Sequence, residues 1–539
     1  MTKRSTPPAR DFTVSRRALL LAGGAGLAAG LLPFGTLRAQ AAGTLAMCVT
    51  PEPNAMCAAF NTASPVTVVS GKMLEGLLNY DFDVSPTPAL ATAWETAGDG
   101  LSITFTLRKG VTWHDGTPFT SADVQYSIME ILKQHHPRGR STLASVTAVE
   151  TPDDHTAIFR LSRPAPALMF ALAGWEAPML PKHVYEGTDV LQNPANNAPI
   201  GTGPFVFGQW ERGSYILLTA NPHYWGEGEP KLERLVIRII TDPSARAAAL
   251  DAGELHLAGD GPVPVNQVQR FVDSPDFHVE TRGSEMNNSL DMIHTNMRNE
   301  HLAKLEVRRA LMHAMDRKKM LDVVYFGLAE ILTGPIPETL PNFYSADVPS
   351  YDYDPQRAKA LLDEAGYPVG PNGFRFGLRL IAPAVGDTYE RMGQFLKQNF
   401  REVGIDLELI SADIPSFIRS VFGEYDYDLT LYPGSVTADP TIGSQRFWWS
   451  KAASKGTPFV NSTAYSSVEM DQVLEAAAVE PDPEKRRDLF VRFQQIAMTD
   501  LPILPVARPI YVTIAAANVV NFVPGPDGIR APYGSLAFT

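Results

Sequence analysis

Residues that could do chemistry are scattered along the chain, and none of them completes a catalytic motif. Gly201-Thr202-Gly203-Pro204 begins like a dinucleotide-binding loop, but Pro204 and the missing third glycine break the pattern. The sequence has no Walker phosphate-binding loop, no His-Glu-x-x-His zinc motif and no Gly-x-Ser-x-Gly nucleophile motif. We therefore expect no enzymatic reaction and no cofactor.

The histidines and clustered acids favour structural roles. His135 and His136 adjoin, so on a helix they would point about 100° apart, and we expect both on a solvated surface. His114 sits at a turn, where a hydrogen-bonding role is expected. The run Glu424–Asp428 is expected to be an exposed edge. No constellation of metal ligands is visible, so no metal site is predicted.

The N-terminus predicts export. Five Lys or Arg residues occur in the first 17 positions, and an uncharged run from Ala18 to about Leu37 follows. Ala39-Gln40-Ala41 fits a small-x-small cleavage site, which predicts a signal peptide over residues 1–41. Arg16-Arg17 stand just before the apolar run, as in twin-arginine signals; an ordinary Sec signal and an uncleaved anchor helix are the alternatives.

Length and composition favour a soluble protein of two or three lobes, and the export signal predicts a periplasmic location. The chain has 539 residues, of which 45% are hydrophobic and 19% charged. Its formal net charge is −13, and without residues 1–41 there are 40 basic and 58 acidic residues. Such a surface repels phosphates, so we expect no nucleic-acid partner and no stable membrane insertion. A monomer is expected.

Two cysteines, Cys48 and Cys57, lie early in the mature chain, and two alternatives stay open for them. They could form a disulfide in an oxidising compartment, or they could be free or buried thiols. The segment Leu45–Cys48 resembles a lipoprotein box only weakly, because bulky Met47 stands where a small residue is needed.

Helical and strand patterns alternate, which predicts an α/β fold. Residues 101–107 alternate as a half-buried strand, and Val111–Trp113 are expected to form the returning strand. Thr120 is expected to cap a helix through a capping box with Asp123.

Further helices are expected over residues 308–324, from Asp354-Pro355 and from Asp482-Pro483, because Asp is a good N-cap and Pro suits the first helical position. The apolar segment 501–506 contains two prolines, so we expect it to be an edge strand or a crossing segment.

A long segment carries a resemblance to a known family. It comprises Pro88–Glu95, Asp99-Gly100-Leu101 and Leu107–Val124, with the core Gly110-Val111-Thr112-Trp113-His114-Asp115-Gly116-Thr117-Pro118-Phe119. This segment resembles the extracellular solute-binding proteins of family 5, the peptide, dipeptide and nickel receptors of ABC importers. Matching segments continue along the chain: Glu75-Gly76-Leu77, Gly201–Phe205, Asn221–Trp225, Val307–Leu311, Met315-Asp316-Arg317 and Tyr353–Tyr367.

The resemblance implies a two-lobed periplasmic-binding-protein fold of the large, three-subdomain type, joined by two hinge strands. Lobe I would comprise residues 42–83, 203–286 and 510–539, with an extra subdomain over 84–202. Lobe II would comprise residues 287–509. Ligand would sit between the lobes, and the segment from Val506 to Tyr511 would be the second hinge crossing.

The resemblance also implies candidate ligand-binding residues. In peptide-binding members, a strand of the second lobe pairs with the ligand backbone, and here that strand is Tyr432–Val436, with Gly434 at its centre. Peptide receptors of the family carry an Asp that binds the ligand's amine at the position of Val436. The usual anchor is therefore missing; Asp439 is a candidate substitute, or the ligand lacks a free amine.

Other candidates follow from position. Arg419 could pair with a carboxylate, although a solvated helix face is an equal alternative. The loop holding Asn54 and Met56 matches a segment that borders the cleft, or is a plain surface loop. Arg508 and Tyr511 lie near the second crossing. Trp448-Trp449 are expected in the core rather than in a cleft wall.

Together these inferences predict an ABC-importer substrate-binding protein that closes on a peptide-sized solute and delivers it to permease subunits. Within this class an opine, an oligosaccharide (or other sugar) or a metal chelate, such as a metallophore, is the alternative ligand. A sensor or chaperone that reuses the fold is an alternative role. A periplasmic hydrolase is the least favoured.

Overall fold

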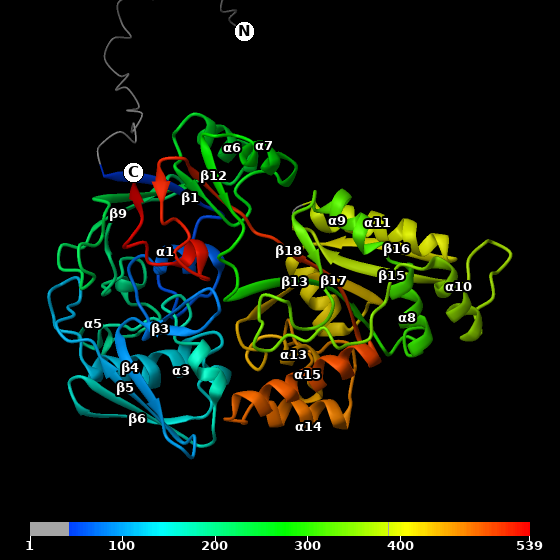
Figure 1. Ribbon diagram of the computed structural model, residues 1–539, viewed down its shortest axis with the longest axis horizontal. Coiled ribbons are helices and arrows are strands. Elements are labelled where there is room, and N and C mark those ends of the chain that lie inside the picture. Colours follow the sequence, from blue (N-terminus) through cyan, green and yellow to red (C-terminus); the bar gives the residue numbers. More distant parts are fainter. Residues whose placement is uncertain (1–42, 386) are drawn as a thin grey trace, which may run out of the picture. The chain divides into compact units, whose positions relative to one another are not determined.

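The computed structural model describes residues 43–385 and 387–539, and residues 43–539 form one compact unit (Figure 1). The expected signal peptide, with its paired arginines and cleavage site, lies outside the described residues. Three main sheets organise the chain, and each collects strands from a different part of the sequence.

The first sheet has seven strands in the order β12-β19-β11-β1-β10-β9-β8. Its strands are β1 (Thr44–Val49), β8 (Phe205–Glu211), β9 (Tyr215–Ala220), β10 (Arg234–Ile239), β11 (Leu257–Ala258), β12 (Phe277–Glu280) and β19 (Thr513–Ala516). β1 pairs in parallel with β10 and β11, so it is central, and all six of its residues are buried, as expected for a parallel strand. Helices α1 (Ser64–Ser70), α6 (Pro243–Asp251) and α7 (Val268–Val272) belong to this part of the chain.

The second sheet has six strands in the order β14-β18-β13-β17-β15-β16. They are β13 (Asn287–Thr295), β14 (Ala329–Ile331), β15 (Phe376–Pro383), β16 (Ile405–Ala412), β17 (Leu429–Thr437) and β18 (Ile503–Pro509). β15 is parallel to both β16 and β17, whereas the other pairs are antiparallel.

Helices cover both faces of the second sheet. One core includes residues of α8 (Leu305–Ala314), α9 (Arg317–Val324), α10 (Pro355–Glu364) and α11 (Thr388–Glu402). The other includes residues of α12 (Ile414–Ile418), α13 (Gln445–Trp448), α14 (Val468–Ala477) and α15 (Pro483–Asp500). Figure 1 shows α9 and α11 on one side of the sheet and α13, α14 and α15 on the other.

The third sheet is antiparallel, in the order β4-β5-β7-β6. It contains β4 (Ala91–Thr96), β5 (Ser102–Leu107), β6 (Val146–Asp153) and β7 (Thr156–Leu161), and helices α2 (Ser121–Tyr126), η1 (Ser127–Leu132), α3 (Lys133–His135), α4 (Gly139–Thr142) and α5 (Lys182–Tyr185) accompany it. Two short pairs complete the strands: β2 (Leu78–Tyr80) with β3 (Pro86–Pro88), and β20 (Val519–Val520) with β21 (Ala537–Phe538).

The chain passes between the first and second sheets twice. Residues 281–286 join β12 to β13, and residues 510–512 join β18 to β19. At the first crossing the Met286 N–H donates to the Pro526 carbonyl. The division into lobes at the boundaries given above remains our proposal.

Several expected elements are confirmed. The half-buried strand is β5, and the capping box between Thr120 and Asp123 is present at the start of α2. Asp354 and Asp482 cap α10 and α15 through hydrogen bonds from backbone N–H groups, with proline in the first turn of each helix.

Other expected elements were wrong. The single helix over 308–324 is two helices, because the Asp316 side chain accepts the Lys319 N–H and starts a new helix. Val111–Trp113 do not form a returning strand, and only Thr112 makes an isolated bridge, with Pro118. By contrast, the expectation for the proline-containing segment 501–506 agrees with the structure in that Pro502 and Pro505 have only β13 beside them: β14 pairs with β18 at Ala507–Pro509 alone, and the register with β13 shifts between Pro505 and Ala507.

Candidate functional site

The parallel strands of the second sheet end at one edge. β15, β16 and β17 run in the same direction, so their carboxyl ends at Pro383, Ala412 and Thr437 lie together. In open α/β sheets, ligands bind outside the carboxyl ends of the strands. The predicted residues Gly434, Val436, Asp439 and Arg419 all lie in or after these strand ends.

The parallel strands of the first sheet also end together. β1, β10 and β11 end at Val49, Ile239 and Ala258, and the loop that holds Asn54 and Met56 follows β1. The candidate site thus draws on the carboxyl edges of two sheets and on the crossing segments between them.

β17 carries an unpaired backbone edge. It pairs with β13 along its whole length, from Leu429 to Thr437, but with β15 only at Leu429 and Thr430. Within the described part of the chain, no other strand covers the second edge from Leu431 to Thr437. Unpaired backbone groups along such an edge can pair with an extended chain, and here Pro433 offers a C=O group but no N–H.

The side chains of the predicted strand are buried and do not offer themselves to a ligand. Tyr432 is fully buried, and its ring stacks on His294 with centroids 4.5 Å apart. A Cβ on Gly434 would come within 2.6 Å of the Met292 methyl carbon, so Gly434 faces the core. Backbone groups are therefore what this strand offers.

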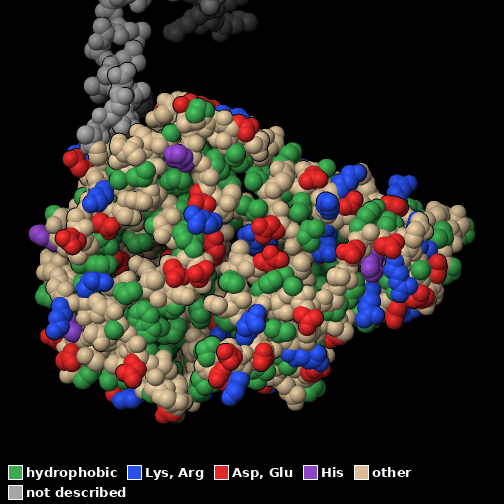
Figure 2. Space-filling model, viewed as in Figure 1, with side chains coloured by type: hydrophobic (Ala, Val, Ile, Leu, Met, Phe, Trp, Pro, Cys, Tyr) green, Lys and Arg blue, Asp and Glu red, His purple; other side chains and the backbone are tan. Residues whose placement is uncertain are grey.

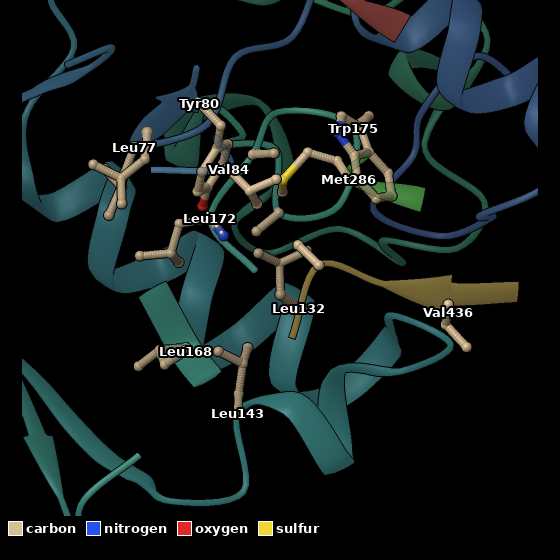
Figure 3. Close-up of a cluster of buried hydrophobic side chains, with 14 of the residues drawn as sticks. Leu77, Tyr80, Val84, Leu132, Leu143, Leu168, Leu172, Trp175, Met286 and Val436 are labelled. Carbon is tan, nitrogen blue, oxygen red and sulfur yellow. Dashed lines mark hydrogen bonds between the residues drawn. The ribbon is translucent and has the colours of Figure 1, made fainter. Parts of the chain in front are cut away.

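Val436 belongs to a buried apolar cluster that also contains Trp175 and Met286 (Figure 3). Trp175 comes from the segment that carries the third sheet, and Met286 from the first crossing. The position of Val436 is thus buried and apolar, which is consistent with the expectation that an amine anchor is missing there.

Asp439 does not fit the substitute role. Both of its carboxylate oxygens accept hydrogen bonds from Arg486, at 2.6 and 2.9 Å, and both side chains are almost fully buried. The carboxylate already has a cationic partner, so the interpretation of Asp439 as the replacement anchor is corrected: it links the loop after β17 to α15.

The two candidate arginines differ in their surroundings. Arg508 pairs with Glu330, directly opposite it on β14, through two hydrogen bonds of 2.7 and 3.0 Å. Arg419 is exposed after α12 and donates to the Ser416 hydroxyl at 3.2 Å. Of the two, Arg419 remains open to a ligand carboxylate.

The loop after β1 is fixed rather than open. Met56 is fully buried in the core of the first sheet, and its N–H donates to the Asn196 carbonyl. Met56 as a ligand contact is therefore corrected. Asn54 is exposed, and its side-chain oxygen accepts the Asn61 amide at 2.7 Å.

Tyr511 lies on the second crossing in a partly open position. It keeps 37% of its surface exposed, although burial raises its pKa to about 12. Burial is the main cause of this shift, and the Ser289 side chain on β13 acts in the opposite direction and lowers the pKa of Tyr511.

Three residues beside Tyr511 were not predicted: Asp291, Tyr325 and Tyr389. Asp291 is 1% exposed and accepts hydrogen bonds from the hydroxyls of Tyr325 at 2.6 Å and Tyr389 at 2.9 Å. Burial raises its pKa to about 6. The available signal was an acid within the apolar run Leu290–Ile293.

The two cysteines are free and buried, so the disulfide alternative is wrong. Cys48 lies in β1, where the charges of Arg246 and Arg238 lower its pKa against the effect of burial. Cys57 interacts with the Tyr185 side chain. Burial raises the pKa of Cys48 to about 11 and that of Cys57 to about 12.

The family-like motifs of the first part of the chain form a structural network. The buried Glu75 carboxylate accepts hydrogen bonds from Thr202, Tyr224 and Trp225 at 2.8 to 2.9 Å. The His114 ring bridges Gly201 and Gly203. The residues of these motifs therefore hydrogen-bond to one another and stabilise the fold; none of them is among the candidate ligand-binding residues.

His136 differs from its expectation. It is 6% exposed, and burial lowers its pKa to about 4, whereas its neighbour His135 is exposed as expected. Trp448, expected in the core, is buried.

Within residues 43–385 and 387–539, three or more His, Cys, Asp or Glu side chains nowhere gather in a way that could hold a metal ion. Over the same residues, no helix has the length and apolarity needed to cross a membrane. On the face shown in Figure 2, Lys and Arg side chains are interspersed with Asp and Glu.

Comparison with known proteins decides the family. Residues 85–456 match the model of the bacterial extracellular solute-binding proteins, family 5. The chain belongs to this family. Its two-lobed α/β architecture is shared by solved structures of an ABC transporter substrate-binding protein and of a periplasmic binding protein.

Individual relatives cover most of this solute-binding protein. The glutathione-binding protein GsiB of Salmonella choleraesuis is 26% identical over 465 residues, covering 85% of this chain and 88% of GsiB. Heme-binding protein A of Haemophilus influenzae is 28% identical, covering 83% of each chain. The crystal structure of the ABC transporter substrate-binding protein CtaP of Listeria monocytogenes is similar with a TM-score of 0.81 and 25% identity, over 92% of this chain and 99% of that one.

Proposed function

We propose that this solute-binding protein captures a peptide or peptide-sized solute outside the cytoplasm and delivers it to the transmembrane subunits of an ABC importer. It binds without reaction, and its mechanism is closure of two lobes around the ligand followed by docking of the closed form.

The free edge of β17 carries this proposal. Seven consecutive residues, Leu431–Thr437, have strand pairing on one side only, at the edge where the parallel strands end. An extended peptide backbone matches such an edge, since its N–H and C=O groups repeat at the same spacing as those of the strand. Tyr432 is buried and Gly434 faces the core, so these two positions offer no side chain to a ligand and specificity for side chains comes from elsewhere.

Closure would use the two crossing segments as hinges. Residues 281–286 and 510–512 are the only connections between the first and second sheets in the described chain. Rotation about two short neighbouring segments moves the two sheets as rigid bodies. Tyr511 lies on one of these segments, so both ligand binding and lobe closure would change the surroundings of its side chain.

A thermal-shift screen of the mature protein tests the proposal. The panel holds di- to pentapeptides, N-acetylated peptides, opines, oligosaccharides and metal chelates. A ligand present at about 100 times its Kd should add about 2.7 kcal/mol to the free energy of unfolding. Stabilisation by peptides supports the proposal. Stabilisation by only one of the other classes reassigns the ligand to that class. If no member of the panel stabilises the protein, a sensor or chaperone role is favoured instead.

A further inference from the structure

The buried carboxylate of Asp291 has no cationic partner. Its two oxygens accept hydrogen bonds from two neutral groups, the hydroxyls of Tyr325 and Tyr389. In the described part of the chain, no ion pair reaches it, and neither Lys nor Arg contributes to the shift of its pKa. A buried charge without a counter-charge costs several kcal/mol, which marks this position as a candidate for function.

The arginines around this position are already paired. Arg508 is bound by Glu330, Arg530 by Asp260 and Arg391 by Asp387. The structure thus neutralises these three cations and leaves Asp291 as an uncompensated negative charge.

Tyrosine side chains separate this charge from solvent. Tyr389 is half-buried and Tyr511 is 37% exposed, and the electrostatic influence of Tyr511 contributes to the raised pKa of Tyr389. Ser289, which contributes to the pKa of Tyr511, stands two residues before Asp291 and therefore on the same face of β13. We call Ser289, Asp291, Tyr389 and Tyr511 the tyrosine recess.

The tyrosine recess lies next to the proposed ligand strand. In the antiparallel register, Asp291 is opposite Pro433 of β17, and Ser289 is opposite Ser435. Neighbouring strands are about 4.8 Å apart, so a chain paired to the free edge of β17 would run roughly 10 Å from the backbone of β13. A side chain or terminus of such a ligand can reach this distance.

The chemistry of the tyrosine recess selects a positive group. A tyrosine that donates its hydrogen to a carboxylate presents its oxygen as an acceptor, and the charge behind it strengthens that acceptor. A cation that reached the face of either tyrosine ring would gain cation–π attraction. An ammonium or guanidinium group would supply the charge that Asp291 lacks.

We propose that the tyrosine recess is a subsite for a cationic group of the transported solute, which takes the place of the amine anchor missing at Val436. The proposal rests on the solute-binding function proposed above and names its substrate class: a solute carrying an amine or a guanidine. Asp291 acts from behind the tyrosines as a positioning residue and a source of charge.

A minimal probe tests the subsite without knowledge of the full ligand. The mature protein, with tyrosines labelled by carbon-13 at Cζ, is titrated at about pH 8 with ethylammonium chloride, and in parallel with ethanol and with sodium chloride. Signals of Tyr389 and Tyr511 are assigned by their loss in Tyr389→Phe and Tyr511→Phe. We expect these two signals to shift with ethylammonium alone, and Asp291→Asn to weaken that binding at least about tenfold, or about 1.4 kcal/mol.

Glu408→Gln is the matched control, because it removes one negative charge from an exposed position of the same sheet. It should leave the titration unchanged. Should Asp291→Asn fail to fold, Tyr389→Phe keeps Asp291 bonded to Tyr325 and should still weaken the shift of the Tyr511 signal. Equal shifts with ethanol, or no shift at about 0.1 M ethylammonium, would overturn the proposal.

The outcomes separate this inference from the proposed function. If peptides stabilise the protein equally well with and without N-acetylation and ethylammonium has no effect, the importer proposal stands and the subsite falls. If ethylammonium binds as described but no peptide does, the subsite stands and the peptide proposal falls.

Discussion

Arg486 donates two hydrogen bonds to the carboxylate of Asp439, with N···O distances of 2.6 and 2.9 Å, and both side chains are no more than 4% exposed. The pair ties the loop that follows the proposed ligand strand to α15. Asp439 is the residue that the sequence suggested as a substitute anchor for a ligand amine.

Breaking this pair should cost stability. Asp439→Asn leaves the Arg486 charge buried without a counter-charge, so we expect a loss of about 3–5 kcal/mol in the free energy of unfolding, measured by urea denaturation. Asp488 is an exposed acid on α15, the helix that carries Arg486. Asp488→Asn should change the free energy of unfolding by less than about 0.5 kcal/mol. A loss below about 1 kcal/mol for Asp439→Asn, together with reduced ligand binding, would return Asp439 to the ligand site.

Asp291 should make stability depend on pH. Because its folded pKa is raised to about 6 from an ordinary value of 3.8, the folded protein binds a proton that the unfolded chain releases in this interval. The free energy of unfolding therefore rises as pH falls from about 7 to about 4, by on the order of 2–3 kcal/mol from this group.

The measurement is urea denaturation of wild type and Asp291→Asn at about pH 7 and about pH 4.5. Glu75 and Asp527, whose pKa values are also raised by burial, keep contributing in the variant. Only the difference between the two proteins reports on Asp291. An identical pH dependence in both would contradict the burial of an uncompensated carboxylate.

Pairing with the edge of β17 should give ligand binding a two-residue period. In a strand, successive backbone N–H groups point to opposite edges, so only every second amide of a bound peptide would face β17. For a peptide found in the screen, N-methylation at alternate positions should weaken binding about tenfold, while the intervening positions should be tolerated. Isothermal titration calorimetry measures the series, and an equal effect at every position would argue against strand pairing.

The two thiols should be present but unreactive in the folded protein. Cys48 and Cys57 are buried and their pKa values are raised to about 11 and about 12, so almost no thiolate exists at neutral pH. A chromogenic disulfide reagent should detect no thiol in the native protein and two in about 6 M guanidinium chloride. Detection of none after unfolding would show that the cysteines are paired.

Sequence patterns predicted local structure where the signal was local. The Thr120–Asp123 capping box and the Asp-Pro starts of α10 and α15 depend on a few adjacent residues, and all three are confirmed. The split at Asp316 was missed because a mid-sequence N-cap competes with an otherwise continuous apolar stripe. The proline-containing segment of β18 has β13 as its only strand neighbour, and the register shift leaves Val506 as the extra residue of β18.

The candidate site could be predicted only in part, because its contacts are long-range. The strand at Gly434 was located through family resemblance, yet its free edge follows from where β15 stops, which no pattern in β17 reveals. Asp439 looked available until its distant partner Arg486 was known. Likewise, Asp291, Tyr325 and Tyr389 meet only after three separate elements pack together.

Amide hydrogen exchange at β17 tests the central claim most directly. Exchange of the mature protein is followed by mass spectrometry with and without a saturating ligand from the thermal-shift screen. We predict that the segment Leu431–Thr437 gains protection on ligand binding, because its free N–H groups become paired, and that the crossing segments 281–286 and 510–512 change together. A ligand that stabilises the protein but leaves exchange in Leu431–Thr437 unaltered would contradict capture at this edge.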